Sequence, residues 1–304
     1  MQRQLLINGV KRTYALHVPA RRTKIFFPLV LLFHGRGGSG EVMLRRTGFA
    51  TKADFEGFAI AAPDGINGHW NDGRGAVNSD VDDISFVKEI VASLKSELPV
   101  DVTKIYAVGS SNGGIFTQRL ACEFCDVLVA VATVGGPLPS NFAQRRPSPM
   151  SILGIQGDED PRVPIDGTRH SIESAASTMN FWASVNSCNP TPTVTHIPPK
   201  VSDTTSVDEY IFSGGSADVV YYIVRGMGHA WPPYPSLENE HETGLTSQNI
   251  NATDVIWNFL YRHSRLPSEA TIVRPRPQRP FAELEKLRRR GKNRRLPTSG
   301  GEPR

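Results

Sequence analysis

Short apolar runs alternate with amphipathic stretches along most of the chain. The apolar runs fall at residues 5–7, 12–18, 28–33, 57–62, 105–108, 127–134, 151–155 and 219–224. Helical spacing of apolar positions occurs at residues 41–55, 82–98, 171–185 and 251–263, and in a stretch that begins at Ile115. The first two runs flank Asn8-Gly9, the turn signal of a β-hairpin. Because continuous apolar runs are typical of strands buried on both faces, the alternation predicts an α/β fold with a mostly parallel sheet that helices cover on both sides.

The run at residues 105–108 leads directly into Gly109-Ser110-Ser111-Asn112-Gly113, and a helical pattern follows. Strand, Gly-x-Ser-x-Gly and helix in this order are typical of a nucleophile elbow, in which a sharp turn exposes the serine hydroxyl. We therefore predict Ser111 as a catalytic nucleophile in a strained backbone conformation. The alternative is an ordinary glycine-rich turn with a solvated serine.

A serine nucleophile needs a general base, and the base needs an acid that orients it. Five histidines follow the first plausible acid, namely His170, His196, His229, His241 and His263. Only His229 lies on a glycine-rich turn directly after an apolar strand, so we predict it as the base. The competing interpretation is a structural histidine with its hydrogen bonds satisfied.

The candidate acids follow the apolar run at residues 151–155. Asp160 precedes Pro161-Arg162-Val163-Pro164, a rigid sequence suited to holding a carboxylate still. We predict Asp160 as the acid and keep Asp158 as the alternative. The chain order serine, acid, histidine is the one found in α/β-hydrolases.

An oxyanion requires main-chain donors near the serine. We predict the N–H groups of Asn112, which follows the serine, and of Arg36, in the loop after the strand at residues 28–33. Gly37 and Gly38 would let this loop approach the substrate. No Lys-Ser/Thr pair follows these glycines, which argues against a phosphate-binding loop.

Seven motifs in order resemble the secreted polyhydroxybutyrate depolymerase family of α/β-hydrolases, which is similar to the feruloyl and acetylxylan esterases of carbohydrate esterase family 1. They begin at His34-Gly35-Arg36, Pro63-Asp64-Gly65, Trp70-Asn71, Asp82-Asp83, Gly109-Ser110-Ser111, Asp160-Pro161-Arg162 and Gly226-Met227-Gly228-His229. The resemblance implies an α/β-hydrolase fold, the triad Ser111, Asp160 and His229, and no metal or other cofactor.

The same resemblance implies a serine esterase that acts on short-chain hydroxyalkanoate esters, polymeric ones included, with feruloyl or acetylxylan esters of plant cell walls as the alternative. Arg36 stands where the family often has cysteine or a small residue, and it could favour an anionic or polar acyl group. Trp70 and Trp231 either flank the site as aromatic platforms for substrate or pack around the triad. Residues 135–150 are too few for a lid domain, so we expect an open cleft.

Two other classes of protein compete with this interpretation. A peptidase of the prolyl-oligopeptidase type shares the triad order but brings a large extra domain for which this chain has no room. A catalytically silent binding protein with a hydrolase fold would be expected to have lost a triad residue.

Charge separates a catalytic domain at residues 1–264 from a tail at residues 265–304. The whole chain has a net charge of +4, but residues 265–304 carry 12 Lys and Arg against 4 Asp and Glu, which leaves 22 basic and 26 acidic residues before them. The catalytic domain is thus mildly acidic, which argues against nucleic-acid binding by it. We expect the basic tail to be disordered, with contact to anionic surfaces as a second possibility.

The chain has three cysteines, and the sequence alone does not decide whether two of them form a disulfide. Cys122 and Cys125 form a C-x-x-C pattern late in a predicted helix, which argues against a redox site, and free thiols or a Cys122–Cys188 disulfide are both compatible with the pattern.

No stretch reaches the roughly 18 apolar residues of a membrane span. The family resemblance implies an extracellular enzyme, but the N-terminal residues lack the apolar segment of a signal peptide, so the cytoplasm is the alternative.

Overall fold

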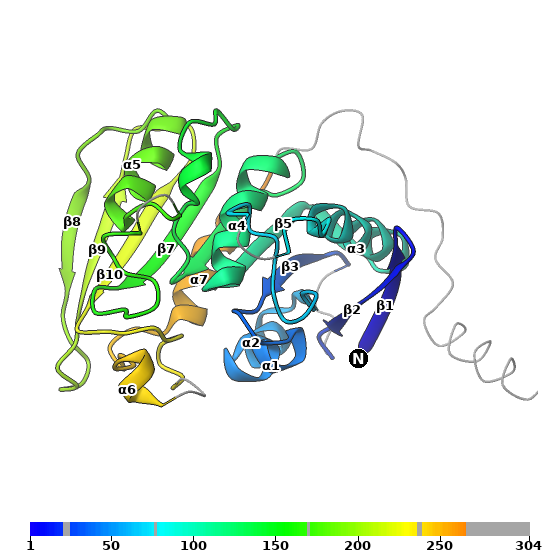
Figure 1. Ribbon diagram of the computed structural model, residues 1–304, viewed down its shortest axis with the longest axis horizontal. Coiled ribbons are helices and arrows are strands. Elements are labelled where there is room, and N and C mark those ends of the chain that lie inside the picture. Colours follow the sequence, from blue (N-terminus) through cyan, green and yellow to red (C-terminus); the bar gives the residue numbers. More distant parts are fainter. Residues whose placement is uncertain (21–24, 76–77, 169–170, 236–238, 266–304) are drawn as a thin grey trace, which may run out of the picture. The chain divides into compact units, whose positions relative to one another are not determined.

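One sheet organises the computed structural model, which describes residues 1–20, 25–75, 78–168, 171–235 and 239–265. Within these residues the strand order is β1-β2-β4-β3-β5-β6-β7-β10-β9-β8 (Figure 1). The six central strands are parallel: β4 (Ala59–Pro63), β3 (Phe27–Phe33), β5 (Val100–Ser110), β6 (Ala130–Val134), β7 (Ser151–Gly157) and β10 (Val219–Arg225). Antiparallel strands extend both edges: β1 (Gln2–Ile7) and β2 (Val10–His17) at one, β9 (Ser206–Phe212) and β8 (Thr193–Ile197) at the other.

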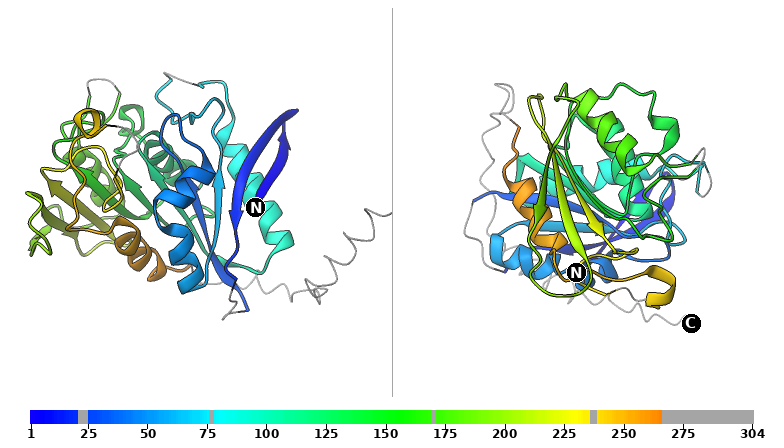
Figure 2. Two further views of the ribbon diagram at one scale, coloured as in Figure 1. Left: turned by 90° about the horizontal axis from the view of Figure 1, so that it is seen from below. Right: turned by 90° about the vertical axis from the view of Figure 1, so that its left-hand side faces the viewer.

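Helices cover both faces of this sheet, as the sequence predicts. One face packs against α3 (Asp83–Glu97), α4 (Asn112–Glu123) and α5 (Ala175–Val185). The other packs against α1 (Gly40–Arg46), α2 (Phe49–Glu56) and α7 (Ala252–Tyr261). The right-hand view of Figure 2 shows α5 in green on one side of the strands and α7 in orange on the other. Every residue of β3, β4, β6 and β7 is buried, which explains their largely apolar sequences.

The structure confirms the β-hairpin that Asn8-Gly9 predicts at the N-terminus. Asn8 and Gly9 both have positive φ, at 49° and 79°, and they connect β1 to β2 as the two central residues of the turn. Two positive φ angles match the twist of the flanking strands, and Asn-Gly adopts them at little cost.

Several predicted boundaries are wrong. The single helix expected at residues 41–55 is two helices, because Gly48 adopts a left-handed conformation with φ 71° between α1 and α2. The helix expected at residues 171–185 begins only at Ala175, where the side chain of Ser174 accepts from the main-chain N–H of Ser177. Strands β8 and β9 were not predicted, because β8 lies at the sheet edge with mostly exposed residues and has no continuous apolar run.

The link between β6 and β7 contains only a short 3₁₀ turn, Ser140–Phe142. No lid domain stands there, as expected from its length. A short helix, α6 (Glu240–Thr243), precedes α7. No helix of the described residues is both long and apolar enough to cross a membrane.

The three cysteines are free thiols, so the Cys122–Cys188 disulfide is absent from this structure. Burial raises the pKa of Cys122 to about 12, which keeps that thiol protonated near neutral pH. The unit Met1–Arg265 ends with the Arg265 guanidinium donating to the carbonyl oxygens of Cys125 and Leu128. The predicted basic tail beyond it lies outside the described residues.

Candidate active site

Ser111 occupies the sharp turn between β5 and α4. Its backbone angles are φ 53° and ψ −125°, a conformation that L-residues seldom adopt and that costs about 1–3 kcal/mol. The main-chain N–H of Ser111 donates to the carbonyl oxygen of Val134 in β6 at 2.9 Å, which ties the turn to the neighbouring strand. The predicted strained elbow is therefore present.

The elbow lies directly against the loop that follows β3. A Cβ atom added to Gly113 would come within 2.3 Å of the carbonyl oxygen of His34, so glycine is required at this point. A Cβ added to Gly35 would lie 3.2 Å from the Cβ of Ser111. These close approaches bring the predicted oxyanion loop to the predicted nucleophile.

His229 and Asp160 meet at the carboxyl ends of β10 and β7. Nδ1 of His229 lies 2.7 Å from Oδ2 of Asp160, whose carboxylate is almost completely buried. The other carboxylate oxygen accepts from the main-chain N–H groups of Arg162 and Val163 at 2.9 and 2.8 Å. The two main-chain donors fix the carboxylate, and the carboxylate in turn orients the imidazole.

The alternative acid has other partners. Asp158 accepts from the main-chain N–H of Gly226 at 2.7 Å and from the guanidinium of Arg225 at 3.4 Å. It thus braces the turn that carries His229 without contacting the imidazole. Both candidates are aspartates, so the path of the backbone after β7, and not the residue type, decides which carboxylate contacts His229.

The other histidines considered as bases have their own partners or lie elsewhere. His196 is exposed and pairs with Asp208, and His263 pairs with Asp218. His241 is an exposed residue of α6, and His170 lies outside the described residues.

Gly135, which sequence reasoning missed, forms the floor beneath the His229–Asp160 pair. Its φ is 59°, and a Cβ added to it would lie 3.3 Å from Cε1 of His229 and 3.5 Å from Oδ2 of Asp160. A methyl group at this position would press on the imidazole, and the positive φ would be strained for any residue with a side chain. The available sequence signal was its position at the end of a buried strand.

The two predicted oxyanion donors, Arg36 and Asn112, line the same cleft as Ser111. Asn112 is the first residue of α4, where the main-chain N–H has no intrahelical acceptor. Among the described residues, the N–H of Arg36 donates to no protein group. The Asn112 side chain donates to Asp72 at 2.6 Å and accepts from the N–H of Trp70 at 2.8 Å, so the loop after β4 holds the start of α4 in place.

His34 stabilises the oxyanion loop as a neutral ring. Its Nε2 accepts from the N–H of Gly65 at 3.0 Å, and its Nδ1 lies 2.7 Å from the carbonyl oxygen of Gly35. Nδ1 must therefore carry the proton. Burial lowers the pKa of His34, in agreement with this neutral form.

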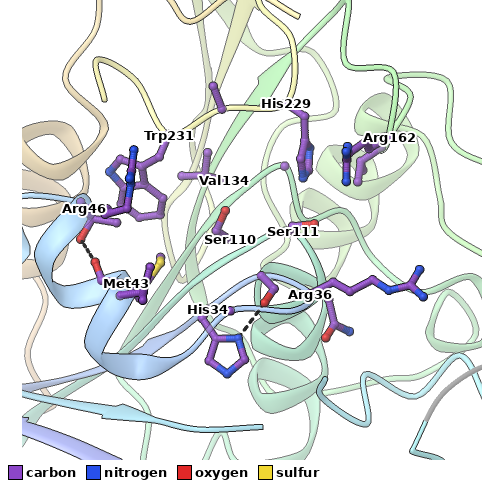
Figure 3. Close-up of a pocket in the computed structure, with 18 of the residues that line it drawn as sticks. His34, Arg36, Met43, Arg46, Ser110, Ser111, Val134, Arg162, His229 and Trp231 are labelled. Carbon is purple, nitrogen blue, oxygen red and sulfur yellow. Dashed lines mark hydrogen bonds between the residues drawn. The ribbon is translucent and has the colours of Figure 1, made fainter. Parts of the chain in front are cut away.

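A cleft of about 510 Å³ opens over the elbow, and Ser111 and His229 both line it (Figure 3). Trp231 and Gly38 line it too. Gly37 does not: its φ is 72°, and its N–H donates to the carbonyl oxygen of Gly68, so it serves the turn rather than the cleft.

Trp70 is completely buried, and its prediction as a substrate platform is wrong. Its ring stacks on Phe116 at an interplanar angle of 7° and meets Phe33 edge-on. Its Nε1 donates to the carbonyl oxygen of His34 at 2.9 Å. Trp70 therefore supports the oxyanion loop from below, which is the packing role that the sequence left open.

Relatives of known name share this chain's sequence over most of its length. A putative esterase, NocK, of Nocardia uniformis subsp. tsuyamanensis is 30% identical over 304 residues, which cover 85% of this chain and 81% of the relative. Feruloyl esterase C of Emericella nidulans is 30% identical over 200 residues, 61% of this chain and 67% of that enzyme. The chain belongs to the feruloyl and acetylxylan esterase-like family of α/β-hydrolases. It is a carboxylic-ester hydrolase.

Solved structures agree with this esterase fold. An acetyl xylan esterase from Aspergillus awamori superimposes with a TM-score of 0.57 at 15% identity, over 76% of this esterase and 95% of that chain. A thermostable esterase superimposes with a TM-score of 0.55 at 17% identity, over 87% and 63% of the two chains. No family model matches the sequence.

Proposed function

We propose that this esterase works through an acyl-enzyme formed on Ser111, with His229 as general base and Asp160 as the acid that orients it. The hydrogen bond of 2.7 Å between His229 Nδ1 and Asp160 Oδ2, beside a serine with φ 53°, is the observation that carries the proposal. With the Nδ1 proton held by the carboxylate, Nε2 is left free to accept the serine proton.

The reaction then has two balanced halves. Oγ of Ser111 forms a bond to the ester carbonyl carbon while its proton passes to Nε2 of His229. The carbonyl bond re-forms as the alcohol leaves with that proton. Water then attacks the acyl carbon while His229 takes a proton from it, and the acyl–Oγ bond breaks as His229 returns that proton to Ser111, which releases the acid and the free serine.

The main-chain N–H groups of Asn112 and Arg36 would hold the oxyanion of both tetrahedral intermediates. Two features support this part of the proposal: the position of Asn112 at the N-terminus of α4, whose dipole favours negative charge, and the lack of a protein acceptor for the Arg36 N–H among the described residues. Donors fixed in advance need no reorganisation when charge develops, and removal of one typically costs about 10²–10³ in rate.

Two acyl branches remain candidates for the substrate. The names of the relatives, feruloyl esterase C and acetyl xylan esterase, favour esters of plant cell walls. The motif order of the sequence favours short-chain hydroxyalkanoate esters, as in polyhydroxybutyrate depolymerases. An extracellular location belongs to the same proposal, and it is tested by comparing esterase activity in the culture medium with activity in washed cells.

The experiment is a hydrolysis panel of p-nitrophenyl acetate, butyrate and octanoate beside methyl ferulate and hydroxybutyrate oligomers. Ser111→Ala should abolish turnover of every ester that the wild type hydrolyses. Ser110→Ala is the matched control, because Ser110 lines the same cleft one residue away. Full activity in Ser111→Ala would refute the assignment of Ser111 as the nucleophile. Whichever is hydrolysed faster, methyl ferulate or the hydroxybutyrate oligomers, would decide between the two acyl branches. A folded wild type without turnover of any ester would favour a silent binding protein.

A further inference from the structure

The charged residues that line the cleft are all basic. Among the described residues, four arginines line it and no aspartate or glutamate does: Arg36, Arg46, Arg74 and Arg162. A concave surface with one sign of charge focuses the electric field and concentrates ligands of the opposite sign. Neither the acetyl nor the feruloyl acyl group carries a negative charge that would use this feature, and a hydroxybutyrate oligomer carries its carboxylate on the alcohol side of the ester bond.

Two of these arginines are neutralised by carboxylates of the protein. Arg74 donates to Asp72 at 2.6 Å, and that carboxylate also holds the elbow. Arg162 lies 3.5 Å from Glu242, with both side chains substantially exposed. These two therefore have roles in the protein itself.

The other two arginines have no carboxylate partner within the described parts of the chain. Nε of Arg36 donates to Nε2 of His69 at 2.8 Å, and Arg46 donates to the carbonyl oxygen of Pro235 at 3.2 Å. Both acceptors are uncharged in these contacts, because a ring nitrogen that accepts carries no proton. Each guanidinium thus keeps its full charge and several unused donors.

Arg46 is the better placed of the two for recognition. It is half-buried, whereas Arg36 is exposed. Figure 3 shows Arg46 with Met43 and Trp231 at one end of the cleft, Arg36 toward the other end, and Ser111 between them. Met43 and Trp231 are each only 8% exposed, so an anion that reaches Arg46 would be shielded from water on the apolar side, where a charged hydrogen bond is stronger.

The position of Arg46 in the last turn of α1 does not by itself explain its direction. Arg45 and Arg46 both complement the negative end of the helix dipole. Arg45 faces solvent and pairs with Glu41 at 3.5 Å, with side-chain exposures of 67% and 65%. Arg46 instead lines the cleft.

We propose that Arg46 binds a carboxylate on the acyl group of the substrate, so that this enzyme hydrolyses monoesters of dicarboxylic acids in preference to neutral esters of equal length. The inference rests on the proposed Ser111 mechanism but on neither acyl branch. The acyl part is assigned to the Arg46 end because the buried side chains of Met43 and Trp231 border that end. The alcohol must depart before deacylation, and the exposed Arg36 end leaves it a route to solvent.

The test compares kcat/KM for p-nitrophenyl hydrogen adipate with kcat/KM for p-nitrophenyl hexanoate. The two acyl chains have equal length, and only the first ends in a carboxylate. Adipate is used because shorter half-esters form cyclic anhydrides without enzyme. Since a hydrogen bond to a charged group contributes about 1.5–3 kcal/mol in favourable sites, the wild type should prefer the anionic ester by about tenfold or more.

Arg46→Met should remove that preference while leaving hexanoate turnover within about twofold. The control Arg45→Met removes the same charge from the same helix turn and should leave both esters unchanged. Arg46→Lys keeps the charge without the planar fork and should keep part of the preference. If Arg46→Met also loses hexanoate turnover, Arg46→Lys and Arg45→Met still carry the test, since equal ratios in those two variants would contradict Arg46 as the carboxylate ligand.

Failure of this inference and failure of the mechanism give different results. A wild type that shows no preference for the adipate ester, with turnover still abolished by Ser111→Ala, overturns only the role of Arg46. Turnover that persists in Ser111→Ala overturns the proposed mechanism. A preference that Arg45→Met reduces as much as Arg46→Met would reflect general electrostatic attraction and would also overturn the inference.

Discussion

Replacement of Asp160 by asparagine perturbs the proposed triad at a single atom. Among the described residues, four donors contact this carboxylate: Arg162 and Val163 at one oxygen, and His229 and Gln156 at the other. An asparagine side chain has one oxygen and one NH₂ group, so one of these two pairs of donors must face the NH₂ group, which is itself a donor. The structure determines which set that will be.

If the amide oxygen faces His229, the NH₂ group opposes two buried main-chain N–H groups. That costs about 1.5–3 kcal/mol for each lost hydrogen bond to a charged acceptor, hence at least about 3 kcal/mol. If the NH₂ group instead faces His229, those two bonds survive but the imidazole must move its proton from Nδ1 to Nε2. We therefore expect the second arrangement, in which Nε2 cannot accept the proton of Ser111.

The expected loss follows from these two terms. A tautomer disfavoured by about 3 kcal/mol is present in roughly one molecule in a hundred. Loss of the charged partner of the imidazolium costs a further 1.5–3 kcal/mol, or about 10- to 100-fold. Asp160→Asn should thus lower kcat on p-nitrophenyl acetate by about 10³- to 10⁴-fold, with thermal unfolding changed by only a few degrees.

Asp158→Asn is the matched control for this prediction. Its amide oxygen can still accept from the N–H of Gly226, so kcat should stay within about fivefold of the wild type. A loss of 10³-fold in Asp158→Asn, beside activity within tenfold of wild type in Asp160→Asn, would show that the acid has been assigned to the wrong carboxylate.

Three further perturbations test the surroundings of the site. Gly135→Ala should cost about 1–2 kcal/mol of stability from its φ of 59° and should also lower kcat at least about tenfold by pushing on His229, whereas Gly9→Ala, with φ 79° and open space around it, should show the stability loss alone in urea unfolding. Asp72→Ala removes the carboxylate that accepts from the side chain of Asn112, and it should lower kcat about tenfold with little change in KM. Asp72→Asn should recover part of the lost kcat. An unchanged kcat in Asp72→Ala would show that the contact is dispensable. Burial lowers the pKa of His34, so its neutral form should contribute stability fully above about pH 6.5, and that contribution should be lost as pH falls through the lowered value; urea unfolding of His34→Asn should lack this part of the pH dependence, and equal dependence in both proteins would contradict it.

The sequence identifies the elements that its own local patterns determine. The strained turn at Ser111 follows from glycines and a strand within a few residues, and the hairpin follows from Asn8-Gly9. The break at Gly48 was missed because a glycine inside a helical pattern can either be tolerated or end the helix. Strand β8 was missed because a solvated edge strand lacks the apolar signal.

Roles that depend on distant parts of the chain were harder to assign. Trp70 looked like a site residue from its neighbours in sequence, but Phe33 and Phe116, far from it in sequence, enclose it completely. Gly135 and Arg46 have no motif around them, and only the fold brings the first beneath His229 and the second into the cleft. Long-range packing of this kind leaves no local pattern.

The central claim, an acyl-enzyme on Ser111, is tested most directly by acid-quenching the enzyme during turnover of p-nitrophenyl acetate and measuring the mass of the protein and of its peptides. The account predicts an added acetyl group on the peptide that contains Ser111. This group should be present in Ser110→Ala and absent in Ser111→Ala, and in Asp160→Asn it should form no faster than that variant turns over the ester. An acetyl group on a different residue, or hydrolysis that continues in Ser111→Ala, would contradict it.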